Sequence, residues 1–327
     1  MGGRVRILVV GGTSFIGRAI AWSAWHHAHT VTVLNRGRTA SDLPGAVEHL
    51  VGDRHGDLSA LAGRDFDATI DVIAYRPVDV DRLADALGER GGRHLQVSSV
   101  SAYRDPERDG ATEDDLELWD DAGLDPASDV TAATYGPLKA ACERAARRRF
   151  GDDVTIVRPT YVIGAHDHTL RFPYWVARVR RGGEVAAPGP REARLQWIDA
   201  RDLAEFSLGV LEDGLTGPFH VAAPPGGAPF VEVIERVAAH AAPPGTRVLE
   251  VPAEAVLAAG LASRFPLWSP RPEALSTLDT ARARAAGLVA RPLEESVDDV
   301  LEWWGARPGP DHWLSPEDEA RLLATSR

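Results

Sequence analysis

The sequence is poor in cysteine, in long apolar runs and in net positive charge. Its 327 residues include one cysteine, Cys142, which excludes an internal disulfide and any cysteine-rich metal site. No segment approaches the roughly 20 apolar residues of a membrane span, and residues 5–10 are too short for a secretory signal. The formal net charge of −12 at pH 7 argues against nucleic acid as the main partner. We therefore expect a cytoplasmic protein that binds neither membranes nor nucleic acid.

Short β-branched runs alternate with helical stretches in the first half of the chain. Each run has the length of a buried strand, and the stretches between them are long enough for helices. The expected strands are residues 5–10, 30–34, 68–73, 93–99 and 154–158, and the expected helices are residues 15–25, 78–87 and 135–150. Strands that alternate with helices form βαβ units. The pattern predicts an α/β fold with a doubly wound parallel sheet.

Proline and glycine become denser after residue 158, which indicates a second, smaller lobe. Further helices are expected at residues 173–181, 231–242, 252–262 and 293–304. Residues 195–204 and 217–224 have strand character and are expected to return to the first sheet. The predicted organisation is a first domain over residues 1–158, joined by 195–224, and a smaller lobe over residues 159–194 and 225–327.

A glycine-rich loop follows the first expected strand in the segment VGGTSFIG. Gly11, Gly12 and Gly17 would let backbone N–H groups at the start of the next helix approach an anion closely. A dinucleotide pyrophosphate fits such a loop, although glycines also serve strand-to-helix turns that bind nothing. The middle position of the usual glycine pattern is a serine here. The cofactor contacts expected in this loop are Gly11, Thr13, Ser14, Phe15, Ile16 and Gly17.

The end of the second expected strand, LNRGRT, bears on which dinucleotide binds. An acidic residue at this point in dinucleotide folds binds the ribose 2′-hydroxyl, whereas arginine can meet a 2′-phosphate. Here Asn35 takes the place of the acid, with Arg36 and Arg38 beside it. NADP(H) is therefore favoured over NAD(H), although both arginines could simply be solvated. Asp53 could accept a hydrogen bond from the adenine amino group, or could stabilise a turn.

A tyrosine and a lysine lie four residues apart in YGPLK, and so on one face of the expected helix. An ammonium group near Tyr135 would favour its phenolate and make it a usable acid or base. The segment VSSVSAY places hydroxyl groups at the carboxyl end of the fourth expected strand, where doubly wound sheets bind ligands. Tyr135, Lys139 and a serine of this segment are therefore the candidate catalytic group.

Taken together, these motifs resemble the extended short-chain dehydrogenase/reductase proteins, also called the NAD-dependent epimerase/dehydratase family. VGGTSFIG resembles the family's glycine fingerprint, SSVSAY its serine segment and YGPLK its YxxxK motif. Residues 157–164, 195–204 and 281–304 also resemble family segments, so the likeness covers most of the chain. It implies a Rossmann fold with a C-terminal substrate lobe, a nicotinamide cofactor, a small-molecule substrate and, by family habit, a homodimer.

The resemblance also assigns roles to individual residues. Ser99 corresponds to the catalytic serine and Tyr135 to the acid/base, with Ser98 and Ser101 as less favoured serines. Lys139 corresponds to the residue that binds the nicotinamide ribose and lowers the tyrosine pKa. Further cofactor contacts implied in this way are Ala74, Pro159 and Val162.

Departures from the family pattern weaken the case for a nucleotide-sugar substrate. Tyr161 stands where the family's sugar-nucleotide enzymes have a substrate-contacting asparagine. Glu273 and Ala274 replace a glycine and an acid, which leaves Arg271 as a phosphate contact. The candidates for the substrate site, supported only weakly by the sequence, are Ser101, Tyr161, Trp175 and Arg271. The aromatic residues expected near the pocket, which are more often core, are Phe172, Tyr174, Trp175, Trp197 and Trp268.

Two polar clusters are discounted. His26, His27 and His29, and separately His166 and His168, lack a convincing further ligand, so no metal is expected. The acidic residues 111–125 read as a solvated flap over the site. The expected reaction is hydride transfer between nicotinamide and a hydroxyl- or carbonyl-bearing small molecule. The alternatives are a nucleotide-sugar epimerase or dehydratase with a recycled cofactor, and a catalytically silent NADP-sensing or RNA-binding relative.

Overall fold

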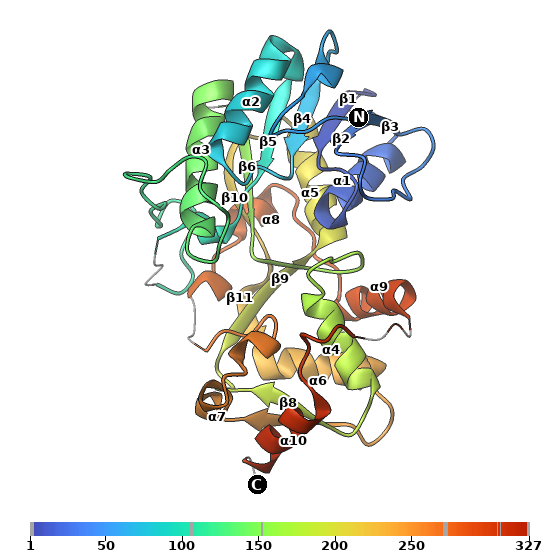
Figure 1. The fold of residues 1–327 in the computed structure, drawn as a ribbon, viewed down its shortest axis with the longest axis vertical. Helices are drawn as coiled ribbons and strands as arrows, with labels where there is room; N and C mark the ends of the chain where they lie inside the picture. Colours follow the sequence, from blue (N-terminus) through green and yellow to red (C-terminus); the bar gives the residue numbers. More distant parts are fainter. Residues whose placement is uncertain are drawn as a thin grey trace.

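A seven-stranded parallel sheet forms the upper part of the molecule in the computed structural model (Figure 1). The structure describes residues 3–104, 108–151, 153–270, 274–305, 307 and 309–325. The strand order is β10-β6-β5-β4-β1-β2-β3. The strands are β1 (Arg6–Val10), β2 (Thr30–Asn35), β3 (Glu48–Val51), β4 (Ala68–Asp71), β5 (Arg93–Val97), β6 (Thr155–Pro159) and β10 (Gly217–Val221). The order reverses between β1 and β4, which is where such sheets bind ligands.

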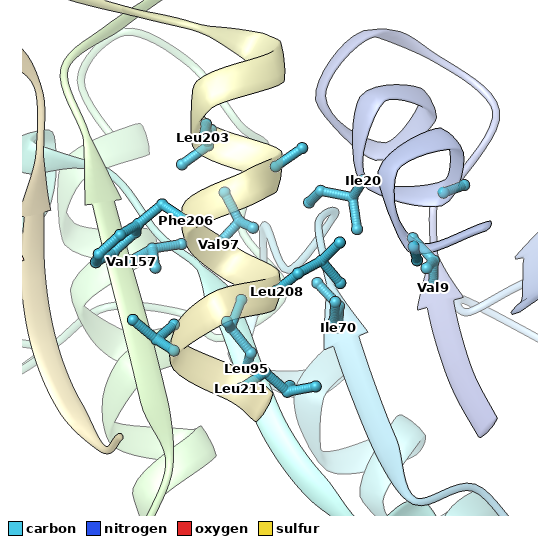
Figure 2. Packing of buried hydrophobic residues seen from close by; sticks show 14 of the residues in the cluster. Val9, Ile20, Ile70, Leu95, Val97, Val157, Leu203, Phe206, Leu208 and Leu211 are labelled. Carbon is cyan, nitrogen blue, oxygen red and sulfur yellow. The ribbon is translucent and has the colours of Figure 1, made fainter. Parts of the chain in front are cut away.

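Two pairs of helices cover this sheet. The covering helices are α1 (Phe15–His26), α2 (Pro77–Leu87), α3 (Tyr135–Phe150) and α5 (Ala200–Glu212). Helix α1 packs beside α5, and α2 packs beside α3. Figure 2 shows Leu203, Phe206, Leu208 and Leu211 of α5 pointing onto the sheet, where they meet buried side chains of β4, β5 and β6. The doubly wound Rossmann fold expected from the sequence is confirmed.

The smaller lobe has its own apolar core below the sheet (Figure 1). A three-stranded sheet of order β11-β9-β7 and a two-stranded sheet of β12 and β8 belong to it. Its strands are β7 (Tyr161–Ile163), β8 (Glu184–Pro188), β9 (Arg194–Asp199), β11 (Ala223–Pro229) and β12 (Arg247–Val251). Its helices are α4 (Arg171–Arg180), α6 (Phe230–Ala241), α7 (Ala253–Ala258), α9 (Leu293–Trp304) and α10 (Pro316–Ala324).

The return of residues 195–224 to the first sheet was only partly correct. Strand β10 does pair with β6, and α5 covers the large sheet. Strand β9, however, pairs with β7 and β11 and not with the large sheet. Part of the C-terminal region also packs against the first core, because Ala283 of α8 (Ala281–Ala285) lies in that core. Among the described residues, we find no helix long and apolar enough to cross a membrane.

Candidate active site

The glycine loop brings the start of α1 close to the end of β1. Gly11 has a φ of +89°, a conformation that side chains disfavour. A Cβ atom added to Gly17 would lie 2.1 Å from the Gly11 carbonyl oxygen, so only glycine fits there. Ser14 occupies the N-cap position, and its side chain makes no capping hydrogen bond. The loop therefore offers a side-chain-free cradle and a helix N-terminus, which fit a pyrophosphate group.

A cavity of about 250 Å³ opens beside this loop. Arg36 and Arg38 line it and are exposed, and Asn35 next to them accepts a hydrogen bond from Gly37 N at 2.7 Å. Asp53 also lines the cavity, but its carboxylate accepts a hydrogen bond from His55 N at 3.0 Å. Asp53 therefore stabilises a turn at the edge of this cavity. The other expected contacts that line it are Gly11, Thr13 and Ser14.

A buried ion pair at this cavity was not anticipated from the sequence. Arg54, which lines the cavity, donates from both terminal nitrogens to the Asp71 carboxylate, at 2.7 and 2.9 Å. Burial pushes the pKa of Asp71 upward, but the Arg54 guanidinium outweighs this and holds it below its ordinary value. Asp71 ends β4, so the pair fixes the loop after β3 to the centre of the sheet.

A second cavity, of about 390 Å³, contains the expected chemical groups. Tyr75 lines both cavities, so the two cavities adjoin at this residue. Tyr75 was not identified from the sequence, because nothing local distinguishes it from other loop aromatics. The sequence-predicted residues that line the second cavity are Phe15, Ile16, Ser98, Ser99, Ser101, Tyr135, Pro159, Tyr161 and Val162.

Ser99 and Tyr135 both line this cavity, and the Ser99 hydroxyl is close enough to act on the pKa of the phenol. Ser99 follows β5 and Tyr135 begins α3, and Gly136 allows the two segments to approach. A Cβ atom on Gly136 would lie 2.4 Å from the Ser101 carbonyl oxygen. Burial raises the pKa of Tyr135 above its ordinary value, while the hydrogen bond with Ser99 and the charge of Arg171 act in the opposite direction. The phenol is therefore protonated at neutral pH and can donate a proton.

Lys139 lies one turn further along α3 and is buried. Its ammonium donates to the carbonyl oxygens of Val97, at 2.7 Å, and Ala74, at 3.1 Å. It also lies 5.4 Å from the centre of the Tyr75 ring. Lys139 thus joins α3 to the end of β5 and to the loop after β4, and it is not among the described residues that line either cavity.

Arg171 was missed by sequence reasoning, although it directly precedes an aromatic cluster that was noted. It lines the second cavity, and its Nε donates to Thr169 Oγ1 at 2.9 Å. Its guanidinium carbon lies 5.5 Å from the centre of the Tyr161 ring. No short motif marks such a residue, because the chain returns to the cavity only after β7.

Behind Ser99 runs a buried chain of hydrogen bonds. Ser98 donates to Glu143 at 2.5 Å, and Arg158 donates to both Glu143 and the Tyr103 hydroxyl. The Tyr103 hydroxyl lies 2.6 Å from His220 Nε2, while His220 Nδ1 lies 2.9 Å from a backbone carbonyl. Because the carbonyl requires a proton on Nδ1, Nε2 accepts from Tyr103. Ser98 also lines the second cavity, but its hydroxyl is bonded to Glu143, which leaves the hydroxyls of Ser99 and Ser101 for a ligand.

Several expected substrate residues lie elsewhere. Trp175 is fully buried in the second core, and its Nε1 donates to the Pro266 carbonyl oxygen at 2.7 Å. Trp175 is therefore a core residue, and its assignment to the substrate site was wrong. The other aromatics of that group are buried in the same core: Phe172, Tyr174, Trp197 and Trp268. Arg271 and Glu273 lie outside the described residues.

The acidic segment and the histidine cluster also differ from expectation. Glu113 is buried and accepts a hydrogen bond from His220 N at 2.7 Å, so the segment is anchored. Among the described lining residues, none of 111–125 contributes to either cavity. His27 and His29 approach Glu212, with ligand atoms within 4.8 Å of one another. Glu212 lies on α5, 2.7 Å from His29 Nε2, and the sequence did not reveal that this carboxylate meets the two histidines.

Comparisons with known proteins identify the family and the fold. The sequence model of the NAD dependent epimerase/dehydratase family matches residues 7–222. The chain is similar to the chloroplast stem-loop binding protein of 41 kDa b from Arabidopsis thaliana, at 26% identity over 222 residues. That alignment covers 63% of this chain and 55% of the relative, so the chain spans little more than half of the relative's length.

Solved structures share the fold along nearly the whole chain. UDP-N-acetylglucosamine 4-epimerase from Bacillus cereus superposes with a TM-score of 0.65 at 20% identity, covering 95% of this chain and all 100% of that one. The Bordetella bronchiseptica enzyme WbmH in complex with NAD⁺ gives a TM-score of 0.67 at 17% identity, covering 92% of this chain and 99% of that one. With two thirds of its length matched by the family's sequence model, the chain belongs to the NAD-dependent epimerase/dehydratase family.

Proposed function

We propose that this protein is a dinucleotide-dependent oxidoreductase that transfers a hydride between NADP(H) and a hydroxyl- or carbonyl-bearing small molecule. The observation that carries the proposal is the pair of adjoining cavities that share Tyr75. One contains the glycine cradle and two arginines, and the other contains Ser99 and Tyr135. An extended dinucleotide spans two such cavities with its phosphates at the start of α1.

The exposed arginines favour NADP(H). Arg36 and Arg38 follow β2, and Asn35 stands where an acid would repel a 2′-phosphate. Guanidinium groups match a phosphate in charge and in geometry. NAD(H) is the alternative cofactor, and the NAD⁺ complex of the structurally similar Bordetella enzyme supports it.

The chemistry at the second cavity follows from the residues around Tyr135. When bound, nicotinamide supplies or accepts the hydride. Tyr135, protonated at neutral pH, gives its proton to a substrate carbonyl oxygen in the reducing direction. Ser99 donates a hydrogen bond to the same oxygen and so orients it. Lys139, whose ammonium lies 5.4 Å from the centre of the Tyr75 ring, would contact the cofactor ribose and favour the tyrosinate in the reverse direction.

A second candidate within the same class is a nucleotide-sugar epimerase or dehydratase that returns the hydride to its own substrate. The structural similarity to UDP-N-acetylglucosamine 4-epimerase supports this reading. Tyr161 opposes it, because its aromatic ring occupies the place of the family's asparagine in the second cavity.

A third candidate, of a different class, is a stem-loop-binding protein without turnover. It is supported by the similarity to the Arabidopsis protein that carries this name. The net charge of −12 opposes it, since nucleic-acid binding depends on positive charge. Filter binding with a structured RNA tests this candidate directly. Salt-sensitive binding at micromolar protein concentration would favour it over the oxidoreductase.

Calorimetric titration of the cofactor-stripped protein with NADP⁺ and NAD⁺ tests the main proposal, preceded by an absorbance spectrum of the unstripped protein. We expect exchangeable binding that prefers NADP⁺. Tight NAD⁺ carried through purification would instead indicate an epimerase or dehydratase with a recycled cofactor. Binding of neither dinucleotide would contradict both enzymatic proposals.

A further inference from the structure

The second cavity differs in charge from the rest of the molecule. The chain has 48 acidic and 36 basic residues, yet no aspartate or glutamate is among the described residues that line this cavity. Its charged or titratable side chains there are Arg171 and His168, apart from Tyr135 and other phenols. A cation in a cavity without carboxylates attracts an anion and excludes competing cations.

Arg171 is held in place by its own loop. The Asp167 carboxylate is buried and accepts hydrogen bonds from Thr169 N, at 2.9 Å, and from Arg171 N, at 3.2 Å. Thr169 Oγ1 in turn accepts from Arg171 Nε. These bonds restrict the loop and the base of the arginine side chain before any ligand arrives, which reduces the entropy lost on binding.

The end of the guanidinium group has no acidic partner in the described part of the chain. Of the ion pairs within 4.0 Å there, none involves Arg171, whereas most other arginines of this protein pair with a carboxylate. The group lies against the Tyr161 ring, which leaves its two terminal nitrogens as donors toward the cavity. A planar fork of this kind matches a carboxylate or a phosphate oxygen pair.

Arg171 also acts on the proposed acid. Its positive charge favours the ionised form of Tyr135 and is one of the causes that lower the pKa of that phenol against the effect of burial. An anion bound at Arg171 would cancel part of this charge. Substrate binding would therefore keep Tyr135 protonated, as a proton donor requires.

We propose that Arg171 binds an anionic oxygen group of the substrate, a carboxylate or a phosphate, while the substrate's carbonyl or hydroxyl group lies at Ser99 and Tyr135. This inference rests on the proposed function and extends it to the class of substrate. Two sources share the chemistry: a small oxo- or hydroxy-acid, and a phosphorylated or nucleotide-linked molecule.

The test is calorimetry on the protein saturated with the dinucleotide that it binds, because the cofactor then blocks anion binding at Arg36 and Arg38. The probes are acetoacetate, its uncharged methyl ester, inorganic phosphate and UDP. Arg171→Gln removes the cation and Arg171→Lys retains it. Arg180→Gln, on the exposed side of the same helix, is the matched control, and urea unfolding verifies that each variant is folded.

We expect at least one anionic probe to bind more tightly than the methyl ester, and Arg171→Gln to weaken that binding about 10- to 100-fold. Arg171→Lys should recover part of the affinity, and Arg180→Gln should leave it unchanged. Acetoacetate alone would indicate a small carboxylate, whereas phosphate and UDP would indicate a phosphorylated substrate.

Anion affinity that Arg171→Gln leaves unchanged, or no anion binding at all, would overturn the inference. Its failure is separable from that of the proposed function, because cofactor binding is measured first. Intact dinucleotide binding together with anion binding that ignores Arg171 would refute the substrate class alone. Absent dinucleotide binding would refute the proposed function itself.

Discussion

The two adjoining cavities are built in opposite ways. Around Tyr135 the chemical groups are held in place, since Ser99 accepts a hydrogen bond from Ser101 N and Lys139 donates to two backbone carbonyls. Beside the glycine loop, Arg36 and Arg38 are exposed. Residues that must act on one atom of a substrate need fixed positions. Residues that only select a cofactor phosphate can stand in solvent, so cofactor preference can change at little cost in stability.

The largest effect is expected at Tyr135, in the cavity whose chemical groups are held in place. Tyr135→Phe removes the only proton that the phenol can give, so we expect turnover to fall about 10²- to 10⁴-fold. Cofactor affinity, measured by calorimetry, should remain nearly intact, because the ring is retained. Tyr75→Phe is the matched control, as it keeps the ring that both cavities share. Retained activity in Tyr135→Phe would sink the assignment of the acid/base.

The next largest effect is expected at the buried ion pair of Arg54 and Asp71, in the cavity that Arg36 and Arg38 line. Arg54→Met leaves the Asp71 carboxylate buried without its partner, which should lower the free energy of unfolding by about 3–5 kcal/mol. Urea unfolding measures this loss. The double variant Arg54→Met with Asp71→Leu removes both charges and should regain much of the stability. If Arg54→Met is as stable as the wild type, the buried ion pair does not stabilise the part of the fold that carries Arg36 and Arg38.

A moderate effect is expected for the exposed arginines themselves. Replacing Arg36 and Arg38 together by alanine should weaken NADP⁺ binding about 10- to 100-fold, because hydrogen bonds to a charged phosphate are lost. NAD⁺ affinity and the urea midpoint should not change. Calorimetry with both dinucleotides provides the comparison. Equal losses for NADP⁺ and NAD⁺ would contradict a role in selecting the 2′-phosphate.

The pH dependence of the two reaction directions sharpens the same contrast. Burial raises the pKa of Tyr135, so the protonated form needed for reduction is present throughout the neutral range. Oxidation needs the ionised form. While the pH is below that pKa, the ionised fraction rises about tenfold with each unit of increasing pH. Initial rates should therefore rise with pH for oxidation and stay flat near neutrality for reduction. A neutral-range optimum for oxidation would contradict the proposed role of the phenol.

The smallest effect is expected at an ion pair on the surface. Arg64 donates to both carboxylate oxygens of Glu48, at 2.8 and 2.9 Å, with both side chains well exposed. Arg64→Met should change the free energy of unfolding by about 1 kcal/mol or less, since water screens the pair. Urea unfolding in parallel with Arg54→Met would separate the two kinds of arginine. Similar losses would show that burial does not set their contributions.

Local patterns predicted most of the fold and the centre of the site. The expected bounds of helices 135–150 and 293–304 are those of α3 and α9. The order of a parallel sheet predicted that a serine of residues 97–103 lies near Tyr135, and the family resemblance selected Ser99 among them. Periodicity does not specify a strand's partner, which is why β9 was assigned to the wrong sheet. Arg171 reaches the cavity of Tyr135, and Glu212 reaches the two histidines, only through tertiary packing, so no spacing in the sequence marks them.

The aromatic residues show the same limit from another side. Tyr161 and Trp175 lie fourteen positions apart and looked equally suited to a pocket. Tyr161 lines the second cavity, whereas Trp175 faces Phe230 and Phe265 in the second core. Tyr161 begins β7 beside the cavity, whereas Trp175 lies on the face of α4 that packs into the smaller lobe. The aromatic content of a segment does not reveal which face of its helix is buried.

The interleaving of the two lobes has a consequence for dissecting the protein. The large sheet takes its last strand, β10, and its covering helix α5 from beyond the first stretch of the smaller lobe. A fragment ending at residue 158 would expose the apolar side chains that meet Leu203 and Phe206 and would leave β6 as an open edge. Such a fragment should aggregate instead of folding. We therefore expect that neither lobe can be expressed or grafted alone, and that a truncated or chimeric protein has to contain both lobes.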